Sequence, residues 1–190
     1  ILTDITFVRD NISLTSLTIR MFFNCISLSN IYFNNISIDS IPVECFFNCK
    51  SLQKLEIIGD DEGDEIKISN RLPDNVTIIH KSAFSYCAKM PNLEFPTNLE
   101  KIHMNAFKNC RKLIFNTFPS SVEYIGYSSF NGCEQIPSLL FPNINTRIRR
   151  YAFHNCTNLR KVVLPYGSEY IDNDTYFPTK CTFKKFEANI

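Results

Sequence analysis

The chain has 190 residues, 44% of them hydrophobic, a composition typical of a folded protein with one sizeable core. A net charge of +1 gives no reason to expect a nucleic acid or an anionic membrane as partner, and only five glycines argue against a glycine-rich phosphate-binding loop. No apolar run has the length needed to span a bilayer. The start at Ile1, without an initiator methionine, indicates a fragment or a processed product.

Residues 1–16 are predicted to form a partial repeat, because Leu2, Ile5 and Phe7 have the spacing of strand positions that recur further along the chain. After this segment, a phenylalanine three residues before a cysteine recurs six times. The six pairs are Phe22–Cys25, Phe46–Cys49, Phe84–Cys87, Phe107–Cys110, Phe130–Cys133 and Phe153–Cys156. The first two cysteines are 24 residues apart and the last four are 23 residues apart. Such a period predicts a solenoid, in which each repeat packs on its neighbours because none can bury its apolar face alone.

Each copy combines two periodicities. In the fourth copy, Phe107, Cys110 and Leu113 recur at every third residue, which predicts one side of a short helix. In the sixth copy, Val162 and Leu164 alternate as in a strand, and Pro165 ends that strand because it has no N–H to donate. We therefore expect each unit to be one short helix and one short strand, with parallel strands stacked about 4.8 Å apart.

The residue before the cysteine is asparagine in four copies and glycine in one. The column is Asn24, Asn48, Tyr86, Asn109, Gly132 and Asn155. Asparagine and glycine are the residues that best tolerate a left-handed backbone, so this column predicts a left-handed conformation that closes the helix. Tyr86 is the exception, and we expect it to be strained or differently turned.

The second copy is longer than the others. Cys49 and Cys87 are 38 residues apart, an excess of 15 over the usual period, and the extra residues are assigned to an insertion at 58–71. The acidic run Asp60–Glu65 between two apolar segments predicts a hairpin with an acidic tip. Binding of Ca²⁺ there is the alternative, but the run lacks the alternating ligand spacing of an EF-hand loop. A solvated tip is favoured.

Residues 171–190 are predicted to form a degenerate last repeat. Ile171 opens it, but Tyr176 and Thr179 stand where the phenylalanine and the cysteine are expected. Degenerate end repeats are typical of solenoids, because the last turn faces water on one side.

Residues 79–96 and 148–165 resemble the repeat of the BspA-type leucine-rich repeat family, whose pattern is approximately I-x-x-x-A-F-x-x-C-x-x-L-x-x-[IVL]-x-[LF]-P. The resemblance covers residues 1–190 apart from the insertion. It implies a single right-handed α/β leucine-rich-repeat solenoid, a parallel β-strand ladder with short helices, with six full repeats of about 23 residues and partial end repeats. Members are bacterial and protist proteins, often on the cell surface and implicated in adhesion. The resemblance implies a binding role and carries over no catalytic residues.

The six cysteines of the repeat are predicted to form a buried ladder of reduced thiols, since cysteine is among the most buried residue types. Disulfides between turns are the alternative, although the Cβ atoms of parallel strands are farther apart than a disulfide favours. A zinc site is not expected, because a column of parallel thiols does not bring four ligands together. Cys45 and Cys181 lie off the column and are the candidates for pairing or reactivity.

His80 and His103 occupy the same column of successive repeats, so their rings could stack as a metal-binding or pH-sensing pair. Two exposed histidines that meet by accident are the favoured interpretation. No serine or cysteine is placed beside a histidine and a carboxylate by spacing, so we expect neither an enzyme nor a cofactor. Five Asn-x-Ser/Thr sequons give weak evidence for secretion: Asn11, Asn35, Asn75, Asn155 and Asn173.

The outward positions of the predicted strands are the candidate binding residues. They drift from acidic to apolar along the concave face, where apolar residues near the far end are rimmed by basic ones, as in many protein-binding sites. The candidates are Tyr32, Glu56, Glu94, Ile114, Phe115, Thr117, Leu140, Arg160, Lys161 and Val163. The alternative to a binding role is that solenoid strands simply tolerate outward apolar residues. Asn116 falls on an inward column and is expected to be buried, with a hydrogen bond to the backbone or to water.

These observations favour a non-enzymatic protein-recognition domain of a cell-surface or secreted adhesion-type protein, with a host, matrix or signalling protein as ligand. The alternative is an intracellular leucine-rich-repeat scaffold or regulatory module that docks a signalling protein. Family resemblance and sequons favour the first, whereas unpaired cysteines suit the reducing interior of a cell. The residues leave open the ligand, the compartment and the oligomeric state.

Overall fold

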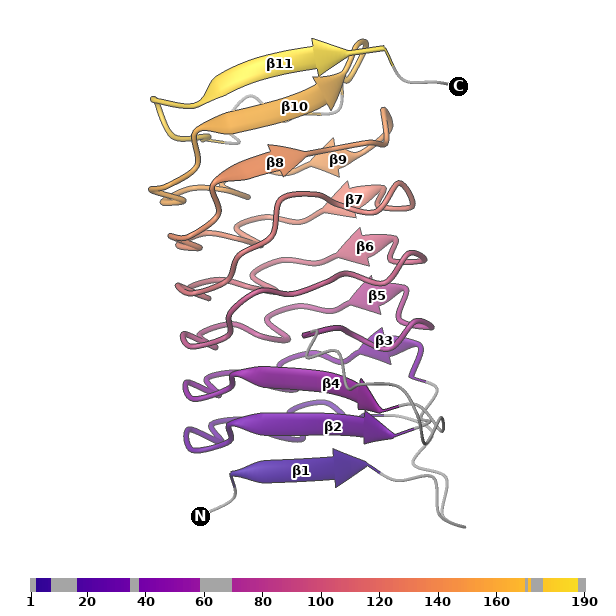
Figure 1. Cartoon of the computed structure of the whole chain (residues 1–190), viewed down its shortest axis with the longest axis vertical. Coiled ribbons are helices and arrows are strands. Elements are labelled where there is room, and N and C mark those ends of the chain that lie inside the picture. The colour runs from indigo at the N-terminus through magenta and orange to yellow at the C-terminus, as the bar shows by residue number, and fades with distance from the viewer. Residues whose placement is uncertain are drawn as a thin grey trace.

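The computed structural model describes residues 3–7, 17–34, 38–58, 70–169, 171 and 176–187. The chain winds into a solenoid in which the strands of successive turns lie parallel and one above another (Figure 1). The predicted architecture, a ladder of parallel strands with a repeat of about 23 residues, is confirmed.

Two rows of strands run along the molecule (Figure 1). The first row forms a surface that we call the strand face, and it consists of β1 (Asp4–Phe7), β2 (Asn30–Asn34), β4 (Lys54–Ile58), β8 (Ser138–Leu140), β10 (Lys161–Pro165) and β11 (Thr182–Phe186). The second row is one five-stranded sheet of two-residue strands, made of β3 (Ser40–Ile41), β5 (Ile78–Ile79), β6 (Lys101–Ile102), β7 (Tyr124–Ile125) and β9 (Arg147–Ile148).

The predicted strand columns are those that the pairing brings together. Ile5 pairs with Ile31, and Ile31 pairs with Leu55, so the partial first repeat continues the ladder. In the second row, the aliphatic residue that opens each copy is buried in every case, as Ile79 and Ile102 illustrate. Each inward column therefore becomes one line of contacts through the core.

The predicted short helices are wrong. The Phe–Cys segments are hydrogen-bonded turns, in which Cys110 N donates to Phe107 O at 3.1 Å and Leu113 N donates to Cys110 O at 3.0 Å. Alternate N–H groups earlier in these turns donate to the next repeat, as Phe107 N does to Ser129 O at 2.7 Å and Asn109 N does to Asn131 O at 2.7 Å. A helix would need those groups for its own i−4 carbonyls, so bonding between repeats replaces helix formation.

The predicted left-handed column is confirmed. All six residues before the cysteines have positive φ, from 59° at Asn109 and Asn155 to 77° at Gly132. Tyr86 has a φ of 65°, which makes it the strained exception that its residue type predicted. A second left-handed column, two residues before each phenylalanine, was not predicted. Its members are Arg20, Glu44, Ser82, Asn105, Ser128 and Tyr151.

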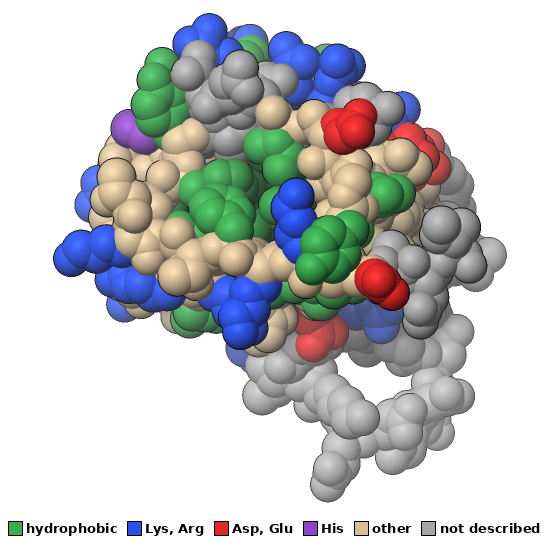
Figure 2. Space-filling model, turned by 90° about the horizontal axis from the view of Figure 1, so that it is seen from above, with side chains coloured by type: hydrophobic (Ala, Val, Ile, Leu, Met, Phe, Trp, Pro, Cys, Tyr) green, Lys and Arg blue, Asp and Glu red, His purple; other side chains and the backbone are tan. Residues whose placement is uncertain are grey.

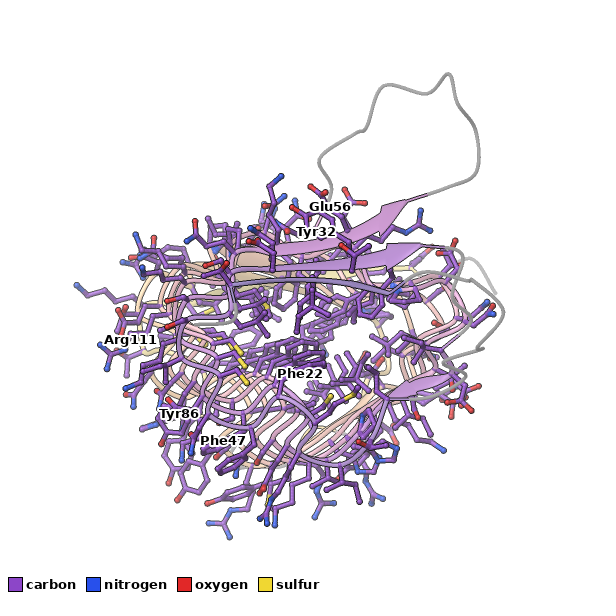
Figure 3. The ribbon with its side chains drawn as sticks, turned by 90° about the horizontal axis from the view of Figure 1, so that it is seen from below. Phe22, Tyr32, Phe47, Glu56, Tyr86 and Arg111 are labelled. Atoms are coloured by element: carbon purple, nitrogen blue, oxygen red, sulfur yellow. The ribbon has the colours of Figure 1, made fainter. Side chains whose placement is uncertain are left out.

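The core is a column of stacked phenylalanine rings. Phe84, Phe107 and Phe130 are fully buried, and neighbouring rings lie 5.2 Å apart and within 9° of parallel. The stack runs from Phe22, which points into the interior in Figure 3, to Phe177. Because each ring contacts the ring above and the ring below, the rings set a common spacing for the turns.

A column of thiols runs beside the rings. Each cysteine from the second copy onward donates its S–H to the carbonyl of the phenylalanine one repeat earlier, at 3.0–3.2 Å, as Cys110 does to Phe84. All eight cysteines are free thiols. Burial raises the pKa of the Cys49 and Cys156 thiols to about 12, so both remain protonated at neutral pH.

Cys45 and Cys181 differ from this column and from each other. Cys45 is fully buried, and burial raises the pKa of its thiol to about 12. Cys181 is half-buried, and burial also raises the pKa of its thiol. A raised pKa lowers the thiolate fraction, so neither side chain has the environment of an activated cysteine.

The last repeat continues the solenoid, but the residue that fills its phenylalanine column lies one position later than predicted. Phe177, and not Tyr176, stacks on Phe153 at 5.4 Å, whereas Tyr176 stacks on Tyr151 at 4.8 Å. The final strand β11 leaves Phe183 54% exposed. Figure 2, seen from this end, shows hydrophobic side chains in the middle of the end face, with lysine and arginine side chains mostly around its edge.

The acidic tip Asp60–Glu65 and most of the predicted hairpin lie outside the described residues. Where the described chain resumes, Arg71 N donates to Leu55 O at 3.0 Å, and Arg71 forms a parallel bridge with Glu94. Asn70 and Arg71 therefore add one short row to the strand face between β4 and the next repeat. In the part of the chain that the structure describes, no helix is long and apolar enough to cross a membrane.

Candidate functional site

The strand face is regular at both ends and interrupted in the middle. β1, β2 and β4 pair along their lengths, as do β10 and β11. Between β4 and β8, the pairing on this face is reduced to isolated parallel bridges, which are Arg71–Glu94, Asn92–Ile114 and Thr117–Leu140. Figure 1 shows the same region without arrows, although the second row of strands continues behind it.

A one-residue shift in register causes the interruption. Counted from the cysteine of each copy, Asn92 is the fifth residue and its partner Ile114 is the fourth. Three residues later the registers agree again, because Thr117 and Leu140 are both the seventh. The fourth copy therefore contains a bulge-like irregularity between Ile114 and Thr117, of the kind that turns a side chain to the opposite face of a strand.

The shift exchanges the sides of Phe115 and Asn116. Phe115, predicted to face outward, is only 7% exposed, and its ring lies 5.0–5.2 Å from those of Phe95, Phe118 and Phe130. Asn116, predicted to be buried, is exposed. Both predictions are wrong for one reason: burial of an aromatic ring and hydration of an amide favour the shifted register.

Two adjoining hollows flank the irregularity. The first has a volume of about 530 Å³ and lies between the third and fourth copies. Its lining is apolar in the middle, at Phe95, Phe115 and Phe118, with Asn92 and Glu94 among its polar residues. The second has a volume of about 450 Å³ and is lined by Asn116, Thr117, Ser138, Leu139, Leu140, Lys161 and Val163. Asn116 and Thr117 line both, so the hollows adjoin, and we call them together the depression.

Seven of the ten predicted binding residues line these hollows. They are Glu94, Ile114, Phe115, Thr117, Leu140, Lys161 and Val163. The structure separates the other three from them. Tyr32 on β2 and Glu56 on β4 pair with one another near the N-terminal end, on the strand face (Figure 3). The Arg160 guanidinium turns back to its own backbone, where Nη1 donates to Thr157 O at 2.6 Å.

Glu56 is also less accessible to a partner than its predicted outward position implies. It is 5% exposed, and its carboxylate lies 3.1 Å from Lys54 Nζ. The hollows in turn contain residues that sequence analysis did not select, among them Asn92, Thr97 and Pro137. The signal that could have found them was the polar Asn116 on an apolar column, beside Phe115 on a polar one.

The irregularity also leaves main-chain donors at the depression. Among the described residues, the N–H groups of Phe115, Asn116 and Thr117 have no hydrogen-bond partner, whereas Phe118 N donates to Leu140 O at 3.1 Å. Asn116 and Thr117 are exposed, so their unpaired N–H groups can bind carbonyl or carboxylate oxygens. The depression therefore combines apolar rings with a carboxylate at Glu94 and an ammonium group at Lys161.

The two histidines of the second row do stack. The rings of His80 and His103 lie 5.4 Å apart, and that of Tyr124 lies 5.8 Å from His103. Burial lowers the pKa of His103, with smaller contributions from His80 and Lys101. Within the described ranges, no group of three or more histidine, cysteine or acidic residues is arranged to hold a metal ion.

The sequence matches the family model of the BspA type leucine rich repeat region, in six copies, over residues 2–68 and 62–184. No curated protein matches the chain. Among solved structures, it is similar to a leucine-rich repeat protein from Bacteroides ovatus, with 26% identity and a TM-score of 0.70 over 96% of this chain and 42% of that chain. This chain thus spans less than half the length of the B. ovatus protein.

Two further structures have the same fold at lower identity. The leucine-rich repeat protein of T. pallidum is 23% identical, with a TM-score of 0.67 over 84% of this chain and 71% of that chain. A leucine rich cell surface protein from Faecalibacterium prausnitzii is 21% identical, with a TM-score of 0.60 over 99% of this chain and 61% of that chain.

Proposed function

This chain belongs to the BspA-type leucine-rich repeat family, and we propose that it is a non-enzymatic protein-recognition domain of a cell-surface or secreted adhesion-type protein. The observation that carries the recognition role is the depression at the interrupted part of the strand face. An extended segment of a partner protein would place an apolar side chain against Phe95 and Phe115 and accept hydrogen bonds from the unpaired N–H groups of Asn116 and Thr117.

Charge sets the direction of such a segment. Glu94 lines the first hollow and Lys161 lines the second. A partner with a basic residue at the Glu94 end and an acidic residue at the Lys161 end is complementary, and the reversed order places like charges together. Complementary ends of this kind contribute specificity more than affinity.

Peptides of about ten residues, selected by phage display against the domain, test the recognition role. We expect the Thr117→Arg variant to weaken their binding at least about tenfold, because the larger side chain fills the boundary between the hollows. Thr157→Arg is the matched control, since Thr157 is exposed and lines neither hollow. Failure to select any peptide, or equal affinity for both variants, would contradict the proposed site.

The cell-surface location rests on the family and on the description of the F. prausnitzii protein as a cell surface protein. Its test is the intact mass of the protein from its native source, before and after reduction. Asn75 and Asn155 are exposed sequons, so added glycan mass on a tryptic peptide that contains either residue would support passage through a secretory pathway.

A second candidate is an intracellular scaffold that docks a signalling protein. It is favoured by the eight free thiols, which suit a reducing compartment. The same mass measurement separates the two candidates: a bare chain with all thiols free supports the scaffold, whereas a glycan or a disulfide supports the surface protein.

A further inference from the structure

The Phe–Cys turns of the first four copies form a basic and aromatic surface that lies apart from the strand face. We call it the turn flank. Its aromatic residues are Phe23, Phe47 and Tyr86, and its basic residues are Lys50, Lys89, Lys108, Arg111 and Lys112. In Figure 3, Phe47, Tyr86 and Arg111 project from the flank of the molecule away from Tyr32 and Glu56.

Contacts between repeats hold the turn flank together. The rings of Phe23 and Phe47 stack at 4.9 Å, and Phe47 meets Tyr86 at 5.6 Å with an angle of 68°. The backbones follow the same order, because Lys89 N donates to Lys50 O and Tyr86 N donates to Lys108 O. The aromatic and basic residues therefore lie on adjacent turns and form one continuous surface.

The charge of the turn flank is not neutralised locally. Among the described residues, its four lysines have no carboxylate within ion-pair distance, and only Arg111 has one, Glu134 at 3.6 Å. This is a local excess of positive charge on a chain whose net charge is +1. Such an excess attracts an anionic partner.

The backbone conformation of Tyr86 is a second feature of the turn flank that points to a partner. Tyr86 has a φ of 65° in a column that otherwise contains asparagine or glycine, and it is 39% exposed. A bulky side chain in the left-handed region is strained, and an exposed ring recovers little of this strain energy by burial. In the column before the cysteine, Tyr86 is the one bulky side chain among asparagine and glycine, and this departure points to a contact outside the chain.

The geometry of the aromatic rings limits the chemical class of the partner. Phe23 and Phe47 each cover one face of the other, within 8° of parallel, the Arg20 guanidinium lies over the ring of Phe23, and Tyr86 meets Phe47 at an angle of 68°, so neighbouring groups occupy most of these ring faces. Sugars and nucleobases bind aromatic side chains by stacking on their faces. An apolar surface whose ring faces are occupied suits an aliphatic or aromatic side chain of a protein, which packs among the basic residues.

We propose that the turn flank is a second docking surface, which binds an acidic polypeptide segment that carries one apolar anchor side chain. The anchor packs on Phe47 and Tyr86, and the carboxylates of the segment lie against the lysines of the adjoining turns. This surface acts independently of the strand face.

The probe is a fluorescent peptide of about ten residues, with one central phenylalanine between runs of aspartate and glutamate, measured by anisotropy at two salt concentrations. We expect Tyr86→Asn to weaken binding at least about tenfold while the melting temperature stays the same or rises, because asparagine suits the left-handed position. If Tyr86→Asn does not fold, Tyr86→Gly replaces it, since Gly132 occupies the same column.

Charge variants complete the experiment. Lys50→Glu combined with Lys112→Glu should weaken binding at least about tenfold and reduce its salt dependence. Lys180→Glu combined with Lys185→Glu is the matched control, because it changes net charge equally at exposed sites on the last repeat and should leave affinity within about twofold.

Four results would overturn the proposal. They are no binding of the peptide, equal binding of a peptide with serine in place of its phenylalanine, unchanged affinity of the Tyr86 variant, and binding of sulfated polysaccharide or of phosphatidylserine vesicles in place of the peptide. The last result would assign the same residues to a glycan or to a membrane.

Discussion

At the scale of single residues, Phe115 and Asn116 decide the local register of the strand face. Sequence columns placed Phe115 outward and Asn116 inward, because the count from Cys110 was assumed constant. The structure shows the opposite, since an aromatic ring gains more from burial than one row gains from regular pairing. The polarity of the two residues predicts their sides of the strand correctly, whereas the count from Cys110 predicts them wrongly.

This inversion makes a direct prediction. Phe115→Ala should lower the free energy of unfolding by about 3–5 kcal/mol, as expected for a buried aromatic ring. Asn116→Ala should change it by no more than about 0.5 kcal/mol, because Asn116 is exposed. Urea denaturation followed by circular dichroism measures both. A large loss at residue 116 with little loss at residue 115 would restore the sequence-based register.

The left-handed positions show a different limit of sequence analysis. The column before each cysteine was predicted because Asn and Gly recur in it, and its six φ values confirm this. The column two residues before each phenylalanine has the same conformation, but Arg20, Glu44 and Tyr151 give no such signal. Those residues adopt positive φ because the turn and the bonds to the next repeat require it.

At the scale of elements, the Phe–Cys turn is the element whose structure sequence analysis predicted least accurately. Apolar residues at every third position fit a helix, and they fit equally well a series of turns with bonds three residues apart. The difference lies in where the other N–H groups donate, and this depends on the neighbouring repeat. Periodicity within one copy contains no information about that choice.

The thiol column gives a prediction at this scale. Because the folded-state pKa of Cys156 is about 12, against 9.0 for an unperturbed thiol, the folded protein retains a proton that the unfolded chain releases above pH 9. The free energy of unfolding should therefore fall as pH rises from about 9 toward 12, by up to about 1.4 kcal/mol per pH unit for one thiol.

Urea midpoints at pH 7.5 and pH 10 measure this dependence. Cys156→Ala is the comparison, because it removes one thiol and leaves every lysine and tyrosine in place. We expect the variant to be less stable at pH 7.5 and to lose less stability at pH 10 than the unmodified protein. Equal pH dependence of the two proteins would show that Cys156 does not contribute in this way.

At the scale of the whole molecule, contacts join each turn only to the next, so stability is a sum of turns and interfaces. The turns between Phe84 and Cys156 have neighbours on both sides, and the phenylalanines of their Phe–Cys pairs are fully buried. The last strand, β11, is mostly exposed. The middle of the solenoid should therefore be its most stable part.

Hydrogen exchange followed by mass spectrometry tests this gradient. The hydrogen-bonded backbone amides of residues 84–156 should exchange most slowly, and those of β1 and β11 should exchange faster by a factor of ten or more, consistent with about 1.4 kcal/mol less local stability. Uniform protection from β1 to β11 would indicate a single cooperative unit and would contradict the additive description.

The single-file arrangement of turns also has a mechanical consequence. A load applied along the axis of the solenoid would act on one interface at a time and would peel turns from an end. One turn of 23 residues occupies about 5 Å of axis when folded and spans roughly 80 Å when fully extended. Each released turn would lengthen the chain by about 75 Å, so a partner held at one end could be pulled through several such steps before the stack of rings was lost.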